Sequence, residues 1–125
     1  MGNIKSFEDL DVWQEGKKLV LKTYVLTNDF PKEEAYGMTS QVRRAALSIP
    51  ANIAEGFGRY HFMDKAKFYL NARGSLYELK SHLLIARELG FIKDGIQNDV
   101  FQIIEDLGLR INNLIGKTRS MKDRD

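Results

Sequence analysis

The sequence predicts an all-α fold, and more narrowly an antiparallel up-down-up-down four-helix bundle. Apolar residues recur every three or four positions through long stretches, and no stretch alternates with a period of two over a useful length. Four helices of about 20 residues, each about 30 Å long, would account for almost the whole chain of 125 residues. We therefore expect one domain over residues 1–125, with residues 1–8 and 117–125 as flexible ends.

The first helix is expected from Asp9 to Asn28. Asp9 or Asp11 lies near its start, where a negative charge suits the helix dipole. A turn region follows over residues 28–37 and is marked by Pro31. The face of this helix is formed by Trp13, Gly16, Val20, Tyr24 and Thr27.

The second helix is expected from Tyr36 to Glu55. Its apolar stripe keeps the same phase on both sides of Pro50, so we expect one continuous helix kinked at this proline, which removes a backbone hydrogen bond. Gly56 is expected to end the helix as a left-handed C-cap. The stripe consists of Val42, Ala46, Ile49 and Ile53.

The third helix is expected from Asp64 to Leu89, with Gly90 as its C-terminal stop. The fourth begins after Asp94 and frays from Lys117 onward. The apolar side of the third helix is Ala66, Leu70, Leu76, Leu79, Leu83 and Ala86, and that of the fourth is Ile96, Val100, Ile103, Leu107, Ile111 and Leu114.

A polar stripe runs along the second helix beside its apolar stripe. The third helix offers a counterpart at Gly74, which allows close approach, and at Ser75 and Glu78 on one face. We interpret these side chains as a structural polar network, either within the bundle or at a subunit interface. A catalytic or small-molecule pocket built from Arg44, Asn52, Glu55 and Glu78, or a surface for a protein partner, are the alternatives. The stripe is Gln41, Arg44, Ser48, Asn52 and Glu55.

Nucleic-acid binding would have to depend on local clusters of basic residues, because a net charge of +2 is small for a dedicated nucleic-acid-binding protein. Arg59, Tyr60, His61 and Phe62 combine a cation with rings that can stack on bases. Arg43 lies roughly opposite the core stripe, so we expect it to be exposed or at an interface. The candidate binding residues are Arg43, Arg59, Lys65, Lys67 and Arg73, with Lys117 and Arg119 in the tail, where Lys122 and Arg124 add to the excess of positive charge.

We expect no enzyme activity, no cofactor and no metal site. His61 and His82 each lack a second ligand at metal-binding spacing, and no Ser-His-Asp or Cys-His pattern occurs. The absence of cysteine excludes disulfides and thiolate ligands, and it suits a reducing cytoplasm. No apolar run is long enough to span a membrane. Two classes of function remain: an oligomer that binds RNA or DNA through a basic surface, and a structural scaffold that recruits a protein partner.

Three stretches together resemble the four-helix-bundle family encoded by intervening sequences within bacterial 23S ribosomal RNA genes. They are FEDLDVWQEGKKLV, SQVRRAALSIPANIAEGFGR and ARGSLYEL, and the resemblance extends to about Leu114. Arg73 departs from the pattern, since a small or apolar residue is more usual there. The matching positions are Gln41, Arg44, Ala45, Ser48, Ile49, Asn52, Ile53, Glu55, Gly56, Gly74, Ser75 and Glu78.

The resemblance implies a bundle that assembles as a ring, a homopentamer. It also implies kinship with the accessory bundle proteins of diversity-generating retroelements, which bind nucleic acid and a reverse transcriptase. Aromatic residues near the connection between the second and third helices agree with an oligomer, because a monomer needs no such concentration of rings at one end. These residues are Phe57, Phe62, Phe68 and Tyr69.

Overall fold

The described part of the chain is almost entirely helical. A computed structural model describes residues 3–93, 95 and 98–121. Within these residues there are four α-helices, two short 3-10 turns and no strand, which confirms the all-α prediction. The helices are α1 (Asp11–Thr27), α2 (Met38–Phe57), α3 (Phe62–Glu88) and α4 (Asn98–Ser120), and the turns are η1 (Phe7–Asp9) and η2 (Lys32–Glu34).

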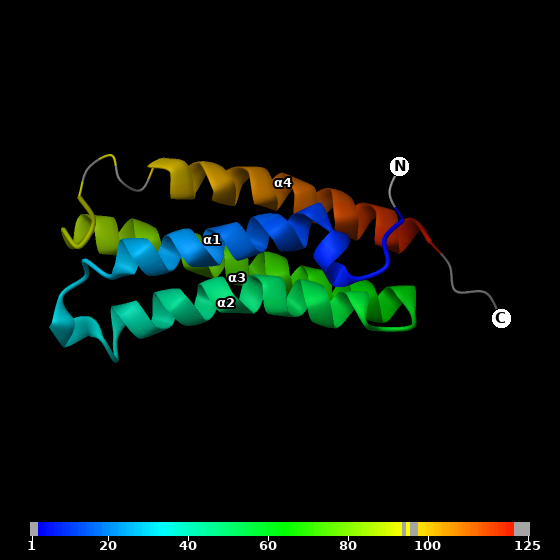
Figure 1. Ribbon diagram of the computed structural model, residues 1–125, viewed down its shortest axis with the longest axis horizontal. Helices are drawn as coiled ribbons and strands as arrows, with labels where there is room; N and C mark the ends of the chain where they lie inside the picture. Colours follow the sequence, from blue (N-terminus) through cyan, green and yellow to red (C-terminus); the bar gives the residue numbers. More distant parts are fainter. Residues whose placement is uncertain (1–2, 94, 96–97, 122–125) are drawn as a thin grey trace.

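The helices pack around a square. α1 contacts α2 and α4, and α3 contacts the same two helices, so that α1 and α3 lie on one diagonal. Figure 1 shows the α1–α2 and α3–α4 connections at one end and the α2–α3 connection at the other. α1 and α3 therefore run in the same direction with their outer sides facing opposite ways.

The core contains most of the apolar residues that the periodicity predicted for α2, α3 and α4. The face predicted for α1 is partly wrong, because Val12, Leu19 and Leu26 are buried there while Trp13, Val20 and Tyr24 are half-buried. The buried side chains interlock between all four helices, and their burial is the main source of stability in a domain of this kind. Ile96 and Asp94, which were expected near the start of the fourth helix, lie outside the described residues. The large side chains that are fully buried include Leu19, Ile49, Ile53, Leu76, Leu79, Leu83, Leu107 and Ile111.

α2 continues through Pro50 as one helix, as predicted. Pro50 is buried, and a Cβ atom added to Gly16 of α1 would lie only 3.5 Å from the Cβ of Pro50. A proline inside a helix lacks the N–H that would bond to the preceding turn. Pro50 is therefore part of the α1–α2 contact, while the bend expected there stays a prediction.

The prediction that Gly56 is a left-handed cap is wrong. Gly56 lies inside α2, and among the described residues only Gly90 and Gly95 have a positive φ. A Cβ atom at Gly56 would lie 2.7 Å from Cε1 of Tyr69 and 3.0 Å from Cβ of Phe68. The glycine is needed because α3 packs against the α2 backbone at this point, so its role is close approach between helices.

Gly90 does end α3, as predicted. Its φ is +80°, its N–H donates to the carbonyl of Arg87, and the N–H of Phe91 donates to the carbonyl of Ala86, both at 3.0 Å. This is a Schellman cap, in which a residue without a Cβ takes the left-handed conformation. The Phe91 ring then packs on Phe30 of the α1–α2 connection with a centroid distance of 5.7 Å, which joins the two connections at this end.

The two chain ends are more regular than the sequence indicated. Ser6 and Asp9 form a capping box at η1, and the ring of Phe7 packs edge-on against Trp13 with a centroid distance of 5.1 Å. At the other end α4 continues to Ser120 and does not fray at Lys117. Residues 1–2 and 122–125 of the expected flexible ends lie outside the described residues.

Candidate interaction surfaces

Arg43 is half-buried and held within the chain, so it is less exposed than expected, and a place at a subunit interface stays a prediction. Its Nε donates to Oγ1 of Thr27 at 2.8 Å and a terminal nitrogen donates to Oδ1 of Asn28 at 3.1 Å. The guanidinium group also lies 4.4 Å from the centre of the Tyr24 ring. Arg43 therefore fastens α2 to the last turn of α1, where a positive charge is favoured by the helix dipole.

Arg44 is the exposed member of the arginine pair. In the part of the chain that the structure describes, no hydrogen bond or ion pair reaches its side chain. The two acids expected beside it are engaged elsewhere, since Glu55 contacts Arg59 at 3.3 Å and Glu78 contacts His82 at 3.4 Å. A network that holds Arg44 inside one chain is therefore wrong.

Ser48 and Asn52 of the polar stripe bond within their own helix. The hydroxyl of Ser48 donates to the Ala45 carbonyl and the amide of Asn52 donates to the Ser48 carbonyl, each at 2.8 Å. Gln41 is exposed and Ser75 is half-buried, and within the described residues neither side chain has a hydrogen-bond partner. A network across a subunit interface stays a prediction.

Gly74 does not mediate close packing within the chain, contrary to expectation. A Cβ atom added there would meet nothing within 4 Å, because Gly74 lies on the outer side of α3. The alternative pocket also finds no support in this geometry, since Arg44, Asn52, Glu55 and Glu78 do not converge on a cavity, and the last three contact their own helical neighbours.

Two of the basic candidates at the α2–α3 connection have structural partners. Lys65 donates from Nζ to the carbonyl of Phe57 at 2.6 Å and so caps the last turn of α2. Partial burial lowers the pKa of Lys65 below its ordinary value. Arg59 pairs with Glu55 and lies 4.5 Å from the centre of the Phe68 ring.

Lys67 and Arg73 complete the predicted set. Arg73 donates to Oδ1 of Asn112 at 2.9 Å and so joins α3 to α4. Lys67 is exposed, and no partner reaches it among the described residues. Lys117 and Arg119 are likewise exposed in the last turns of α4, at the same end of the molecule as the α2–α3 connection (Figure 1). Lys122 and Arg124 lie outside the described residues.

The rings near the α2–α3 connection mostly serve the chain itself. Tyr69 is buried against Gly56, and this burial raises the pKa of its phenol. Phe57 and Phe68 lie beneath Lys65 and Arg59 respectively. Tyr60 differs, since it is 83% exposed and its ring meets His61 edge-on at 4.9 Å. The number of rings at this end therefore gives little support to an oligomer.

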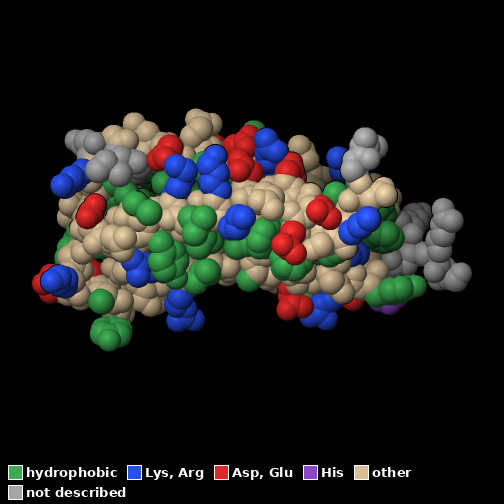
Figure 2. Space-filling view, in the orientation of Figure 1, with side chains coloured by type: hydrophobic (Ala, Val, Ile, Leu, Met, Phe, Trp, Pro, Cys, Tyr) green, Lys and Arg blue, Asp and Glu red, His purple; other side chains and the backbone are tan. Residues whose placement is uncertain are grey.

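Sequence reasoning missed the apolar residues on the outer sides of α1 and α3. Leu21 and Val25 are exposed on α1, as are Tyr77 and Ile85 on α3. Figure 2 shows hydrophobic side chains gathered over α1 on the face toward the viewer, with charged side chains around them. The sequence contained one indication of the α3 surface, because apolar residues of the third helix occur on more than one side.

Comparison with known proteins identifies one family. No curated protein matches the chain. Among the described residues no helix is both long and apolar enough to cross a membrane. The model of the 23S rRNA-intervening sequence protein family matches residues 8–113, which include the four helices except the last residues of α4. The chain therefore belongs to the 23S rRNA-intervening sequence protein family.

Proposed function

We propose that this chain is a non-enzymatic cytoplasmic protein that works as a closed homo-oligomer, with five copies as the family resemblance implies. The observation that carries the proposal is the outer side of α3. This side bears Met63, Tyr77 and Ile85, all of which are exposed in the single chain.

α3 is apolar on two sides, which is unusual for a helix at the surface of a monomer. Its inner side buries Leu76, Leu79 and Leu83. α4 has an ordinary surface pattern, because its outer side carries polar residues with a single large hydrophobic residue, Leu109. On the outer side Met63, Tyr77 and Ile85 lie among polar residues such as Glu78 and Glu88, and exposed apolar side chains gathered on one side of a helix are suited to contact with another chain.

The proposal that the protein is not an enzyme is supported by the arrangement of its polar side chains. The residues with the most suitable chemistry, Arg44, Asn52, Glu55 and Glu78, lie along exposed or half-buried helix surfaces. A catalytic site needs a nucleophile or base within hydrogen-bonding reach of an orienting group in a cleft. Any hydrolase or transferase activity in a crude preparation should disappear as this protein is purified further. Activity that co-purifies with the protein would contradict the proposal.

Sedimentation equilibrium of the purified protein tests the assembly. We expect a mass that is a whole-number multiple of the chain mass of 14.4 kDa, with five copies as the expected number. The closed assembly should keep this mass over a wide range of protein concentration. A mass equal to one chain at every concentration would remove the proposal.

Binding of RNA or DNA backbone is the second candidate function. Its specific support is a set of exposed cations, namely Lys67, Lys117 and Arg119, on segments toward the end of the molecule that also carries the α2–α3 connection with the exposed Tyr60 (Figure 1). Repeated around an oligomer, these residues would form a positive band much stronger than the net charge of one chain. Kinship with retroelement accessory proteins, implied by the sequence resemblance, points in the same direction.

Fluorescence anisotropy with a structured RNA at two salt concentrations tests this candidate. Replacing Lys67, Lys117 and Arg119 by alanine should weaken binding and flatten its salt dependence by roughly one unit of slope for each phosphate that the variant no longer neutralises. The matched control replaces Lys32, Arg87 and Lys93, which are exposed and removed from this group of cations. Equal weakening in both triple variants, or no binding by the native protein at low salt, would favour the scaffold function.

A further inference from the structure

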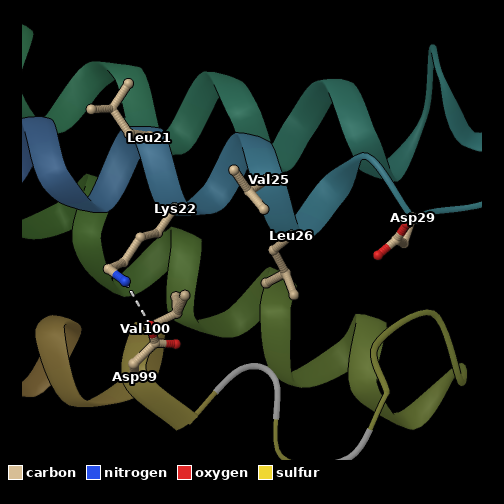
Figure 3. Close-up of a pocket in the computed structure, with 7 residues that line it drawn as sticks. All are labelled: Leu21, Lys22, Val25, Leu26, Asp29, Asp99 and Val100. Atoms are coloured by element: carbon tan, nitrogen blue, oxygen red, sulfur yellow. Dashed lines mark hydrogen bonds and ion pairs between the residues drawn. The ribbon is translucent and has the colours of Figure 1, made fainter.

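The outer sides of α1 and α3 carry two different apolar surfaces. The first lies along a groove between α1 and α4, which has a volume of about 320 Å³ and includes Leu21, Val25, Leu26 and Val100. Figure 3 shows Leu21 and Val25 on α1 and Lys22 reaching across to Asp99 at the start of α4. The second surface includes Ile85 on α3 and Leu89 at its C-cap. Leu21 and Val25 are 61% and 69% exposed, and Ile85 and Leu89 are 48% and 57% exposed.

Ion pairs between the helices fix the heights of these surfaces along the bundle. Asp11 of α1 pairs with Arg110 of α4, and Lys22 of α1 pairs with Asp99 of α4. Because these two helices are antiparallel, the residues about midway between the two pairs lie at the same height. Glu105 of α4 is therefore level with Gly16 of α1. Glu105 also bonds Lys80 of α3 at 2.6 Å. Lys80 is therefore level with Gly16, to within roughly one helical turn.

This register places the two apolar pairs at the same height. α1 and α3 run in the same direction, as Figure 1 shows. Ile85 follows Lys80 by the same number of residues as Leu21 follows Gly16, so these two residues are level. Leu89 and Val25 are level for the same reason. In each pair the residues are four apart, so both pairs lie on one side of a helix.

The α3 surface is flanked by acidic residues, whereas the groove is lined by Lys22, Asp29 and Asp99 and has further lysines beside it. Lys17 and Lys18 are exposed on the outer part of α1, and Glu78 and Glu88 are exposed on α3. By the same register Glu78 lies about one turn from the height of Lys18, and Glu88 lies close to the height of Lys22. Two copies placed side by side with parallel axes would therefore bring unlike charges together.

From these observations we propose that the outer side of α3, at Ile85 and Leu89, seats against Leu21 and Val25 in the α1–α4 groove of a second copy of this chain. The inference rests on the proposed self-assembly and identifies its surfaces. Because the two surfaces differ and face opposite ways, the contact is head-to-tail. Such a contact leaves one free surface of each kind on a dimer. It closes into a ring when the rotation between neighbouring copies brings the last copy back to the first, and otherwise it continues as an open filament.

Mixing of two variants tests the head-to-tail contact. Leu21→Glu alters only the groove and Ile85→Glu alters only the α3 surface, so each variant alone should sediment as a monomer. A one-to-one mixture keeps one native junction per pair, while its other junction brings two glutamates together. The mixture should therefore sediment at twice the chain mass of 14.4 kDa and no higher. Leu109→Glu is the matched control, because Leu109 is 67% exposed on α4 outside both surfaces, and it should keep the native mass.

The outcomes separate this inference from the proposed self-assembly. A monomeric native protein would remove both. A native oligomer with both glutamate variants still assembled, or a mixture that stays monomeric, would overturn the α3-to-groove contact alone. Circular dichroism of each variant checks that the bundle is folded, as expected for changes at exposed positions.

Cysteine cross-linking gives a second measurement that does not depend on disrupting the contact. The chain contains no cysteine, so introduced thiols can react only with each other. Leu21→Cys combined with Ile85→Cys should form a ladder of disulfide-linked copies on a non-reducing gel under mild oxidation. Leu109→Cys combined with Ile85→Cys should stay at the mass of one chain, and an equal ladder in both would overturn the inference.

Discussion

Arg43 and Arg44 are adjacent in sequence and differ in what the neighbouring helix offers them. Arg43 finds two oxygen acceptors and a ring at the end of α1, whereas Arg44 faces solvent. On α2, Arg43 flanks the apolar stripe, whereas Arg44 lies roughly opposite it, so the exposure of Arg44 follows from the helical period. The partners of Arg43 could not be predicted from the α2 sequence alone, because Tyr24, Thr27 and Asn28 belong to α1 and its C-terminal end.

Replacing Arg43 by alanine should lower the free energy of unfolding by roughly 1–3 kcal/mol, since the variant loses charged hydrogen bonds and a cation–ring interaction together. Arg43→Lys should recover only part of this, because lysine cannot reproduce the planar arrangement of donors. Urea denaturation measures both changes.

The matched control for this prediction is Arg44→Ala. It should change the free energy of unfolding by about 0.5 kcal/mol or less, as is usual for an exposed site. Both variants are compared under conditions in which any oligomer is dissociated. If Arg44→Ala lowered the free energy of unfolding more than Arg43→Ala, Arg44 and not Arg43 would be the arginine that joins α2 to α1.

Gly56 gives a second prediction at the scale of the residue. Gly56→Ala places a methyl group within 3 Å of Tyr69, which is buried and held between helices, so the free energy of unfolding should fall by roughly 1–3 kcal/mol. Gly116→Ala in α4 meets nothing within 4 Å and should raise it by about 0.5–1 kcal/mol through helix propensity. Thermal denaturation of the two variants measures both changes. A shift of the melting temperature that is the same in Gly56→Ala and Gly116→Ala would contradict the close packing of α2 and α3.

At the scale of the element, the ion pair between Lys22 and Asp99 joins α1 to the start of α4 at 2.7 Å. The hydrogen bond from Lys22 lowers the pKa of Asp99 below its ordinary value of 3.8. At pH values near 3.8 the folded state therefore binds fewer protons than the unfolded state. The contribution of the ion pair to the free energy of unfolding is complete above pH 3.8 and is lost as the pH falls through the folded-state pKa of Asp99. The pair is exposed, so its contribution at neutral pH should be at most about 1 kcal/mol.

Asp99→Asn tests this pH dependence. The difference between native and variant in free energy of unfolding should be present at pH 7 and should shrink at pH values below 3.8. High salt should also reduce it at pH 7, because exposed charges are screened. A difference that is the same at both pH values would show that the asparagine acts through packing in the groove.

The helices themselves could be predicted because their apolar residues follow the helical period over many turns, and Gly90 could be recognised as a stop because it directly follows such a pattern. Gly56 could not be assigned in the same way. A glycine near a helix end serves either to turn the chain or to admit a neighbour, and only the position of Tyr69 distinguishes the two. The same limit applied to Lys65, which caps α2 from the first turn of α3 across the short connection between the two helices.

For the whole molecule, self-assembly should link thermal stability to protein concentration. Each chain gains stability from its neighbours only in the folded state, so a tenfold rise in concentration should add about 1 kcal/mol per chain and raise the melting temperature by roughly 3–6 °C. The Leu21→Glu variant should melt at a temperature independent of concentration. Concentration-independent melting of the native protein would argue against assembly.

At this scale the sequence predicted the bundle but not its surfaces. The core pattern of α3 is evident at Leu76, Leu79 and Leu83, while Ile85 on its other side and Leu89 at its C-cap look like ordinary scattered hydrophobic residues. Their significance depends on Leu21 and Val25 lying at a matching height, which follows from ion pairs formed between distant segments. Surface complementarity is a property of the folded chain and is not written in any one helix.

The edge-on contact between Phe7 and Trp13 has a practical consequence for every unfolding experiment on this protein. Trp13 is the single tryptophan of the chain, so intrinsic fluorescence reports on the docking of η1 against α1 together with the edge of the core on which Trp13 packs. If the short N-terminal turn detaches before the helices melt, the emission spectrum will shift to the red while the helical ellipticity is unchanged. Fluorescence and circular dichroism recorded on one sample would then give two midpoints, and the lower one would belong to the N-terminal turn.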